Sequence, residues 1–337
     1  MPPPDEKFLR RALELAALGS GLTFPNPRVG AVLVRGGRII GEGFHRRAGT
    51  AHAEVYAVAD AKRRGHRVAG ATLYVSLEPC STHGRTPPCT GLILREKIAR
   101  VVFAATDPNP AHAGAAARLL GAAGVDVAHG LLAREATALN RDFNWFITQK
   151  RPWVTAKIAL SLDGRIVTPA GDDRWLTSPA ARHAAHELRW ESDAILVGAE
   201  TARQDNPRLT VRLPGRRGKL QPWRVVLTRS GKLPKSLHLF SDAHRDRTLV
   251  FRDQPLSDVL AALGEAKISH VLIEGGGQVL TEALDGGLAN EVAFFLAPAA
   301  MGTRPRALGA LKRTLRLSDV TYTPVGPDFL CRGVVAA

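Results

Sequence analysis

The sequence predicts an α/β protein made of two domains. Short apolar runs typical of strands alternate with segments of helical periodicity through most of the chain. The 337 residues, 45% of them hydrophobic, are enough to bury more than one core. Lys150-Arg151-Pro152 interrupts the alternation, so we expect one domain over residues 1–148 and a second over residues 152–337.

The elements of the first domain follow from apolar spacing and from glycine or proline at the ends of runs. Helices are predicted at Asp5–Leu18, at His52–Arg64, in the Ala-rich segment after Pro110 and at about Leu131–Phe146. Strands are predicted at Val29–Val34, Ile39–Phe44, Ala71–Leu77, Arg100–Ala105 and Val125–Ala128. Gly19 is expected to cap the first helix, and Gly36-Gly37 to turn the first two strands into a β-hairpin.

The second domain shows the same alternation. Strands are predicted at Trp153–Leu160, Ala194–Val197, Trp223–Leu227, Thr248–Phe251 and His270–Glu274. Thr177-Ser178-Pro179 is typical of a helix start, and that helix should end near Trp190. Gly275-Gly276-Gly277 opens a further helix, where backbone N–H groups can form an anion cradle, although such a triplet is equally typical of an ordinary turn.

The most informative stretch contains one imidazole, two thiols and a carboxylate. His52, Cys80 and Cys89 provide three N/S ligands and Glu54 a nearby acid/base, which is what a catalytic zinc site requires. His52 and Glu54 can converge only if His52 stands at the helix start. Pro88 is expected as the first residue of the next helix, where the helix dipole favours a Cys89 thiolate.

This pattern is similar to the His-x-Glu and Pro-Cys-x-x-Cys signature of zinc deaminases. Eight residues, rather than two, separate the cysteines here, and such a loop can carry groups that bind a substrate. A closed structural site with His83 as fourth ligand is the alternative, but it leaves Glu54 without a role. Taken singly, His45 and His83 are ordinary loop histidines, and Lys157 is equally compatible with an edge-strand lysine.

Composition limits the partners and the compartment. There is no run of about 18 apolar residues and no signal-peptide pattern, so we expect a cytoplasmic protein without a membrane partner. Three cysteines, the third being Cys331, do not make a disulfide framework. The net charge of +15 raises nucleic acid as a partner, but the basic residues are scattered and aromatic residues are only 6%. Phosphorylated small molecules are therefore favoured over a nucleic-acid editing function.

The chain resembles the bifunctional riboflavin biosynthesis deaminase-reductases along nearly its whole length. In the first domain the matching motifs are Pro25-Asn26-Pro27, Val29-Gly30, Gly43-Phe44-His45, His52-Ala53-Glu54, Glu78-Pro79-Cys80, Gly84-Arg85-Thr86-Pro87-Pro88-Cys89 and Asp107-Pro108-Asn109-Pro110. In the second they are Lys157, Ser161-Leu162-Asp163-Gly164, Trp175-Leu176-Thr177-Ser178, Asp205-Asn206-Pro207, Leu209-Thr210-Val211-Arg212 and Glu274-Gly275-Gly276. The long cysteine loop separates this family from nucleoside and tRNA deaminases.

The resemblance implies a fold and two reactions. A cytidine-deaminase-like αβα domain would use Zn²⁺ to deaminate 2,5-diamino-6-(5-phosphoribosylamino)pyrimidin-4(3H)-one by hydrolysis. A dihydrofolate-reductase-like α/β domain would then use NADPH to reduce the ribosyl group of 5-amino-6-(5-phosphoribosylamino)uracil to ribityl. It also implies a homo-oligomer, a dimer or tetramer, with no nucleic-acid partner. A second domain that only drives oligomerisation is the alternative, and NADPH oxidation would separate the two.

The same resemblance implies roles for individual residues. Glu54, Lys157 and Glu274 would be catalytic, with Lys157 polarising a carbonyl or imine, and Asp163 a candidate partner for it. Substrate contacts are implied at Asn26, His45, His83, Arg85, Asp107, Asn109, Asp173, Arg189, Leu209, Arg212 and Glu274. Cofactor contacts are implied at Ala159, Trp175, Thr201, Asp205, Arg229, Gly276, Gly277 and Gln278.

The chain departs from the family pattern at three places. Thr82-His83 stands where members often have histidine directly after Cys-Ser. Asp172-Asp173 replaces a common Glu-Ser, and Thr228-Arg229 replaces a common Asp-Ser, so that Arg229 would meet the extra phosphate of the cofactor.

The cysteine loop yields a first prediction. Arg85→Ala should raise the KM for the phosphorylated pyrimidine about tenfold or more with a smaller change in kcat, because arginine binds phosphate through paired charge-assisted hydrogen bonds. Steady-state deamination of the substrate and of a dephosphorylated analogue measures this. An equal loss with both compounds would show that Arg85 does not bind the phosphate.

Overall fold

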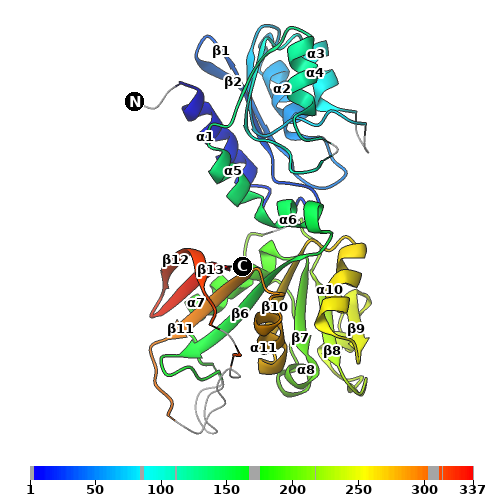
Figure 1. Ribbon diagram of the computed structural model, residues 1–337, viewed down its shortest axis with the longest axis vertical. Coiled ribbons are helices and arrows are strands. Elements are labelled where there is room, and N and C mark those ends of the chain that lie inside the picture. Colours follow the sequence, from blue (N-terminus) through cyan, green and yellow to red (C-terminus); the bar gives the residue numbers. More distant parts are fainter. Residues whose placement is uncertain are drawn as a thin grey trace. The chain divides into compact units, whose positions relative to one another are not determined.

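The computed structural model describes residues 4–83, 87–110, 112–166, 175–216, 218–302, 311–312 and 314–336. Contacts divide the chain into two compact units, residues 1–149 and 150–337, and each unit is built on a sheet of its own (Figure 1). Within the described ranges, no helix combines the length and the apolar character that a membrane span requires.

The first unit is a five-stranded sheet between two layers of helices. Its strands are β1 (Gly30–Arg35), β2 (Arg38–Phe44), β3 (Thr72–Leu77), β4 (Arg100–Ala105) and β5 (Asp126–His129). Its helices are α1 (Pro4–Ala17), α2 (Ala53–Arg63), α3 (Cys89–Arg95), α4 (Ala115–Ala122), α5 (Ala133–Leu139) and α6 (Arg141–Gln149). The strand order is β2-β1-β3-β4-β5, with β3, β4 and β5 parallel and β1 antiparallel to both of its neighbours.

Two apolar clusters hold these layers together. One joins the sheet to α2, α3 and α4, and the other joins its opposite face to α1 and α5 (Figure 1). The predicted strands and the hairpin turn at Gly36-Gly37 are confirmed, and both glycines have positive φ, +54° and +72°. Short-range patterns suffice for these elements because each strand is a short apolar run bounded by turn or polar residues.

Helix α2 lies very close to β2. A Cβ atom added at Gly43 would stand 2.5 Å from the backbone N of Ala57, and one at Gly41 would stand 2.3 Å from the backbone O of Ala57. Only glycine permits this approach, since a side chain would overlap with the helix backbone. The contact places the N-terminus of α2 beside the C-terminal end of β2, where His45 follows.

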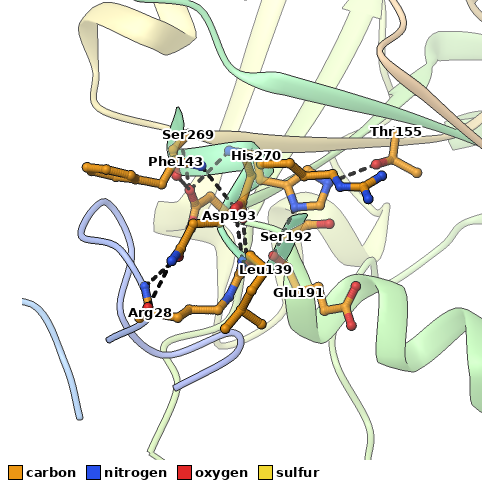
Figure 2. A network of polar contacts seen from close by, with 12 residues as sticks. Arg28, Leu139, Phe143, Thr155, Glu191, Ser192, Asp193, Ser269 and His270 are labelled. Atoms are coloured by element: carbon orange, nitrogen blue, oxygen red, sulfur yellow. Dashed lines mark hydrogen bonds and ion pairs between the residues drawn. The ribbon is translucent and has the colours of Figure 1, made fainter. Parts of the chain in front are cut away.

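Three details of the first unit differ from the sequence prediction. The predicted helix at about Leu131–Phe146 is two helices, because Asn140 accepts a hydrogen bond from the backbone N–H of Arg28 (2.7 Å) and donates one to its carbonyl (2.9 Å). Arg28 also donates to the carbonyl of Leu139 (Figure 2) and forms an ion pair with Asp142 at 2.6 Å. Contacts with Arg28, a residue more than 100 positions earlier in the chain, therefore hold the interruption between α5 and α6 in place.

The other two differences concern helix ends. Pro88 is the N-cap of α3 rather than its first residue, so Cys89 is the first helical residue. Gly19 does not adopt a left-handed conformation; a Cβ there would stand 3.1 Å from the carbonyl O of His45. Close packing, not helix capping, therefore explains this glycine.

The second unit contains an eight-stranded mixed sheet. Its strands are β6 (Trp153–Ser161), β7 (Ala194–Gly198), β8 (Trp223–Thr228), β9 (Thr248–Arg252), β10 (His270–Gly275), β11 (Glu291–Ala297), β12 (Leu317–Val325) and β13 (Asp328–Val335). The helical segments are α7 (Pro179–Glu191), α8 (Ala199–Asp205), α9 (His238–Ser241), η1 (Arg245–Arg247), α10 (Leu256–Glu265) and α11 (Gly277–Asp285). The order is β12-β13-β11-β6-β10-β7-β8-β9, parallel from β11 to β9.

Helices cover both faces of this sheet. Helices α10 and α11 pack on one apolar face, and α7, α8 and α9 contribute to the clusters on the other (Figure 1). The five predicted strands are confirmed, and Ser178 caps α7 by accepting a hydrogen bond from the N–H of Ala181. The sequence prediction missed the last three strands. Most of β12 is exposed, so it lacks the apolar pattern by which strands are recognised.

The approach of α2 to β2 gives a stability prediction. Gly43→Ala should lower the free energy of unfolding by about 1–3 kcal/mol, because the new methyl group overlaps with backbone atoms that cannot rotate away. Urea denaturation followed by circular dichroism measures the change. Gly121→Ala in α4, where an added Cβ meets no atom within 4 Å, is the matched control and should be neutral or stabilising. Equal stabilities for the two variants would contradict the argument.

Candidate functional site

The first site begins at the N-terminus of α2. His52 is the N-cap residue, with an extended backbone (φ −76°, ψ 166°), and Glu54 lies in the first turn. Because the N-cap residue does not have helical backbone geometry, the His52 side chain can lie on the same side as Glu54. The prediction that His52 stands at the start of the helix is confirmed. Glu54 is 3% exposed, so its carboxyl group lies inside the protein next to the imidazole.

Two other elements bring the thiols to the same place. Cys80 follows the end of β3, and Cys89 begins α3, where its backbone N–H donates to the Cys80 Sγ at 3.3 Å. The His52 Nδ1 lies 3.3 Å from the Cys89 Sγ and 3.5 Å from the Cys80 Sγ. Among the described residues, these three form the group whose ligand atoms all lie within 4.8 Å of one another.

The geometry fits zinc. Tetrahedral ligands at about 2.3 Å for sulfur and about 2.0 Å for nitrogen stand roughly 3.5–3.8 Å apart. The observed nitrogen–sulfur separations of 3.3 and 3.5 Å lie at or slightly below the lower end of this range, and the donor set of one nitrogen and two sulfurs is one that zinc prefers. His83 is exposed and lies outside the cluster, so in the part of the chain that the structure describes the three ligands are joined by no fourth one.

The charges of these groups are interdependent. A hydrogen bond from the Cys89 thiol lowers the pKa of Cys80 to about 4 against the effect of burial, and the same bond raises the pKa of Cys89. Without a metal the pair therefore shares one thiolate, so a metal that takes both sulfurs must displace a proton. Burial raises the pKa of Glu54, which suits a carboxyl group that both accepts and returns a proton.

Asn26 and His45 lie beside these ligands, as predicted from their positions at the hairpin ends. The His45 Nδ1 is 3.0 Å from the carbonyl O of Ala51, and its Nε2 is 3.1 Å from the Asn26 Nδ2. Since a carbonyl only accepts, Nδ1 carries the proton and Nε2 accepts from the amide. Burial lowers the pKa of His45, which favours the neutral imidazole. The rings of His45 and His52 lie edge to face, with 5.6 Å between their centroids.

Asp107 and Asn109 lie on the loop that follows β4. Asp107 is 8% exposed, burial raises its pKa, and its Oδ1 accepts from the backbone N–H of Asn109 at 2.9 Å. This loop meets the cysteine loop where the Thr82 Oγ1 lies 3.3 Å from the His112 Nδ1. Two predicted substrate residues, Arg85 and Asp173, lie outside the described residues.

The second unit assembles a charged group at the carboxyl end of its parallel strands. Ile273 pairs with Ala156, so Glu274 on β10 follows beside Lys157 on β6. Arg189 of α7 grips the Glu274 carboxylate with two hydrogen bonds of 2.6 Å, from Nε and Nη2. Burial works to raise the pKa of Glu274, but Arg189 outweighs it and the pKa lies below its ordinary value. Burial lowers the pKa of Lys157, although Glu274 partly opposes this.

The segment 209–212 lies against the same helix. Its Thr210 carbonyl accepts from the Arg189 Nη1 at 3.0 Å, and the Thr210 hydroxyl accepts from the Arg212 Nη1 at 3.0 Å. Leu209 has a positive φ of +48° and is 2% exposed, so only its main chain can contact a ligand. The predicted substrate residues Arg189, Leu209, Arg212 and Glu274 are thus brought together.

A glycine-lined turn lies at the same end of the sheet, where the carboxyl ends of the parallel strands meet. Gly276 has a φ of +83°, and a Cβ on it would stand 3.4 Å from the backbone N of Gly198, at the end of β7. A Cβ on Gly275 would stand 2.9 Å from the Cγ2 of Thr201. Two β–α turns therefore meet without side chains between them at the carboxyl ends of adjacent parallel strands, where dinucleotides bind in open α/β sheets.

The other predicted cofactor residues are distributed around this edge. Ala159 lies two residues after Lys157 on β6, Asp205 ends α8, Gln278 lies in the first turn of α11 and Arg229 directly follows β8. Trp175 is 53% exposed, with the Arg182 guanidinium 4.9 Å from its ring centroid. A turn without side chains and a helix start suit the phosphates of NADPH, so the described residues fit this cofactor.

Comparison with known proteins decides the family. Residues 2–105 match the cytidine and deoxycytidylate deaminase zinc-binding region, and residues 152–331 match the RibD C-terminal domain. The riboflavin biosynthesis protein RibD of Aquifex aeolicus is 40% identical over 319 residues, covering 88% of each chain, and that of Escherichia coli (strain K12) is 36% identical, covering 99% of this chain and 100% of the other. The chain belongs to the RibD family.

Solved structures agree with this assignment. Acinetobacter baumannii RibD superimposes with a TM-score of 0.89 at 34% identity, and the Thermotoga maritima deaminase/reductase with 0.88 at 36% identity, each covering 99% of both chains. The predicted fold class, a cytidine-deaminase-like αβα domain followed by a dihydrofolate-reductase-like α/β domain, is confirmed. As in its family, the chain combines deaminase and reductase domains in one enzyme.

Sequence reasoning did not single out two residues that lie at these sites. Glu78 directly precedes Pro79-Cys80, and this position is the signal in the sequence that could have identified it. His186 lies three residues before Arg189 on α7 and accepts from the backbone N–H of Arg212 at 3.2 Å. Asp163 accepts hydrogen bonds from the backbone N–H groups of Met301 and Gly302, which agrees with the structural alternative for this residue; a role in orienting Lys157 or substrate hydroxyls stays a prediction.

The metal ligands give a direct test. Cys89→Ser should reduce bound zinc well below one ion per chain, because a serine hydroxyl is a much weaker zinc ligand than a thiolate and only two strong ligands of the cluster remain. Glu54→Gln should retain the metal, since Glu54 is outside the ligand cluster. Elemental analysis of the purified, dialysed variants measures both. Full zinc content in Cys89→Ser would remove Cys89 from the ligand set.

Proposed function

We propose that this enzyme catalyses two consecutive steps of riboflavin biosynthesis in separate parts of the chain. Residues 1–148 would deaminate 2,5-diamino-6-(5-phosphoribosylamino)pyrimidin-4(3H)-one by hydrolysis. Residues 152–337 would reduce the ribosyl group of the product, 5-amino-6-(5-phosphoribosylamino)uracil, to ribityl with NADPH. The observation that carries the proposal is the convergence of His52, Cys80 and Cys89 next to the buried Glu54.

In the deaminase site the protein supplies acid/base chemistry and orientation. Bound zinc supplies a water activated for attack at neutral pH. Glu54 would take one proton from the water that adds to C2 and give it to the ring nitrogen of the C2=N bond, and would then carry the proton of the new hydroxyl group to the 2-amino group, which leaves as ammonia. The raised pKa of Glu54 supports this exchange, because the protonated form must be accessible during the reaction.

Asn26 and His45 are proposed to orient the ring. The Asn26 side-chain NH₂ group donates to the His45 Nε2. The side-chain oxygen of Asn26 would then accept a hydrogen bond from an N–H of the pyrimidine ring. Asp107 and Asn109 would contact the pyrimidine from the loop after β4, and His83 and Arg85 from the cysteine loop. Because burial lowers the pKa of His45, its neutral imidazole would add no charge beside the metal ligands.

In the reductase site, NADPH supplies the hydride that reaches the ribose carbon. The ring-opened substrate presents a carbonyl or imine, which becomes more electrophilic when a cation or proton donor stands at its heteroatom. We assign this role to Lys157, whose lowered pKa eases the transfer of the one proton that balances the hydride. Glu274, held by Arg189, would keep Lys157 in place and accept from substrate hydroxyls.

Two arginines are candidates for the substrate phosphate. Arg189 uses Nε and Nη2 for Glu274 and Nη1 for the Thr210 carbonyl, whereas the hydrogen bond of the Arg212 guanidinium within the described residues is that of Nη1 to Thr210. Arg212 can therefore offer a second nitrogen to a phosphate, and we place the main phosphate contact there. The cofactor would lie on Gly276-Gly277 with Thr201 and Asp205, and Arg229 would meet its extra phosphate.

Compartment and assembly complete the proposal. The cytoplasm is supported by the chemistry of the ligands, because Cys80 and Cys89 bind metal as thiolates and all three cysteines are free. The homo-oligomer, a dimer or tetramer, stays a prediction that light scattering can test.

A pair of variants tests the two-site proposal. Glu54→Gln should lower ammonia release by about 100-fold or more, because proton transfer to the leaving amine is lost, and should leave NADPH oxidation unchanged. Lys157→Ala should have the opposite effect, since it removes the polarising group of the other unit. Each half-reaction is assayed with its own substrate in both variants.

The cross-pattern is the decisive result. Loss of both activities in either variant would indicate misfolding or a shared site. Retention of ammonia release in Glu54→Gln, or of NADPH oxidation in Lys157→Ala, would remove that residue from the mechanism.

A further inference from the structure

Glu78 is a buried carboxylate near the metal ligands, and the reaction proposed above gives it no role. It stands directly after β3, two residues before Cys80, and is 3% exposed. Its Oε2 accepts from the backbone N–H groups of Asp107 (3.3 Å) and Gly114 (2.9 Å). Its Oε1 accepts from the backbone N–H of Ala116 at 3.0 Å. One side chain thus satisfies three backbone donors of a single distant segment.

These donors lie at the two ends of the loop that carries Asp107 and Asn109. Gly114 is the N-cap of α4, with a left-handed backbone and no side-chain cap of its own, so Glu78 supplies the cap that the local sequence lacks. A carboxylate at a helix N-terminus also interacts favourably with the helix dipole. Both ends of the loop are therefore fixed to one group.

The backbone of Glu78 is fixed as well. Its N–H donates to the carbonyl of Ala105 at 2.8 Å, at the end of β4, and Pro79 leads directly from it to Cys80. The contact between Thr82 and His112 joins the two loops a second time. The position of the zinc ligand Cys80 and the position of the loop are consequently set by the same residue.

We propose that Glu78 is a positioning residue of the deaminase site. It sets the distance between the zinc ligand Cys80 and the loop 107–112, and so holds Asp107 and Asn109 against the pyrimidine without touching the substrate. The proposal rests on the deaminase function proposed above. A purely structural carboxylate would stabilise the fold but would not act on substrate affinity through Asn109.

Glu78→Gln tests this directly. The amide keeps one acceptor oxygen and turns an NH₂ group towards backbone N–H groups, so part of the network is lost. We expect the KM for the pyrimidine to rise about tenfold or more, with a smaller change in kcat, unchanged zinc content and unchanged NADPH oxidation. Amide hydrogen exchange of Gly114 and Ala116 should accelerate. Glu135→Gln, an exposed glutamate of α5, is the matched control.

A double-mutant cycle separates positioning from general stability. Asn109→Ala should raise the KM in the wild-type background and have little further effect in Glu78→Gln, because both changes remove the same contact. Additive effects would overturn the proposal, as would loss of zinc from Glu78→Gln, which would make Glu78 part of the metal frame. Glu78→Asp, which keeps the charge, should recover part of the affinity.

The hydrogen-exchange result keeps the two proposals apart. If the wild-type chain does not deaminate the pyrimidine but exchange still accelerates in Glu78→Gln, the proposed function fails while the contact stands. If the wild-type chain is active and the variant changes neither KM nor exchange, the positioning role is overturned.

Discussion

The close approach of α2 to β2 is the constraint on which the deaminase site depends. Gly41 and Gly43 let the helix backbone rest directly on the strand, and the N-cap residue His52 then reaches the thiols of Cys80 and Cys89. The second unit uses the same principle, because Gly198 and Gly276 let two β–α turns meet. In both units, glycines without side chains bring backbones together so that polar groups converge at one edge of a sheet.

The two units compensate buried charge in different ways. In the first, the lowered pKa of Cys80 favours a thiolate that can bind a metal cation, and burial raises the pKa of Glu54. In the second, Arg189 neutralises Glu274 while Lys157 stays nearby with a lowered pKa. At the opposite end of that sheet, polar residues are also buried but serve the fold, as in the contact of Thr155 with His270 at 2.9 Å (Figure 2).

The fusion of the two activities is chemically coherent. The product that leaves the deaminase is the substrate proposed for the reductase, and both carry a phosphate that suits the basic character of the chain. Each unit has its own sheet and its own apolar clusters, so a local change in one site need not disturb the other. The independence of the cores is the reason to expect that each half-reaction can be removed separately.

The sequence by itself predicted the cluster of His52, Cys80 and Cys89 and the strands as far as β10, because these follow from residue chemistry and short-range spacing, and its motifs indicated the family by resemblance. Only the tertiary structure decided the features that depend on contacts between distant residues. Arg28 breaks a helix at Asn140, Arg189 holds Glu274, and Glu78 caps α4 across more than thirty residues of chain. Such contacts leave no local pattern, since the partner residues meet only after the sheets have formed.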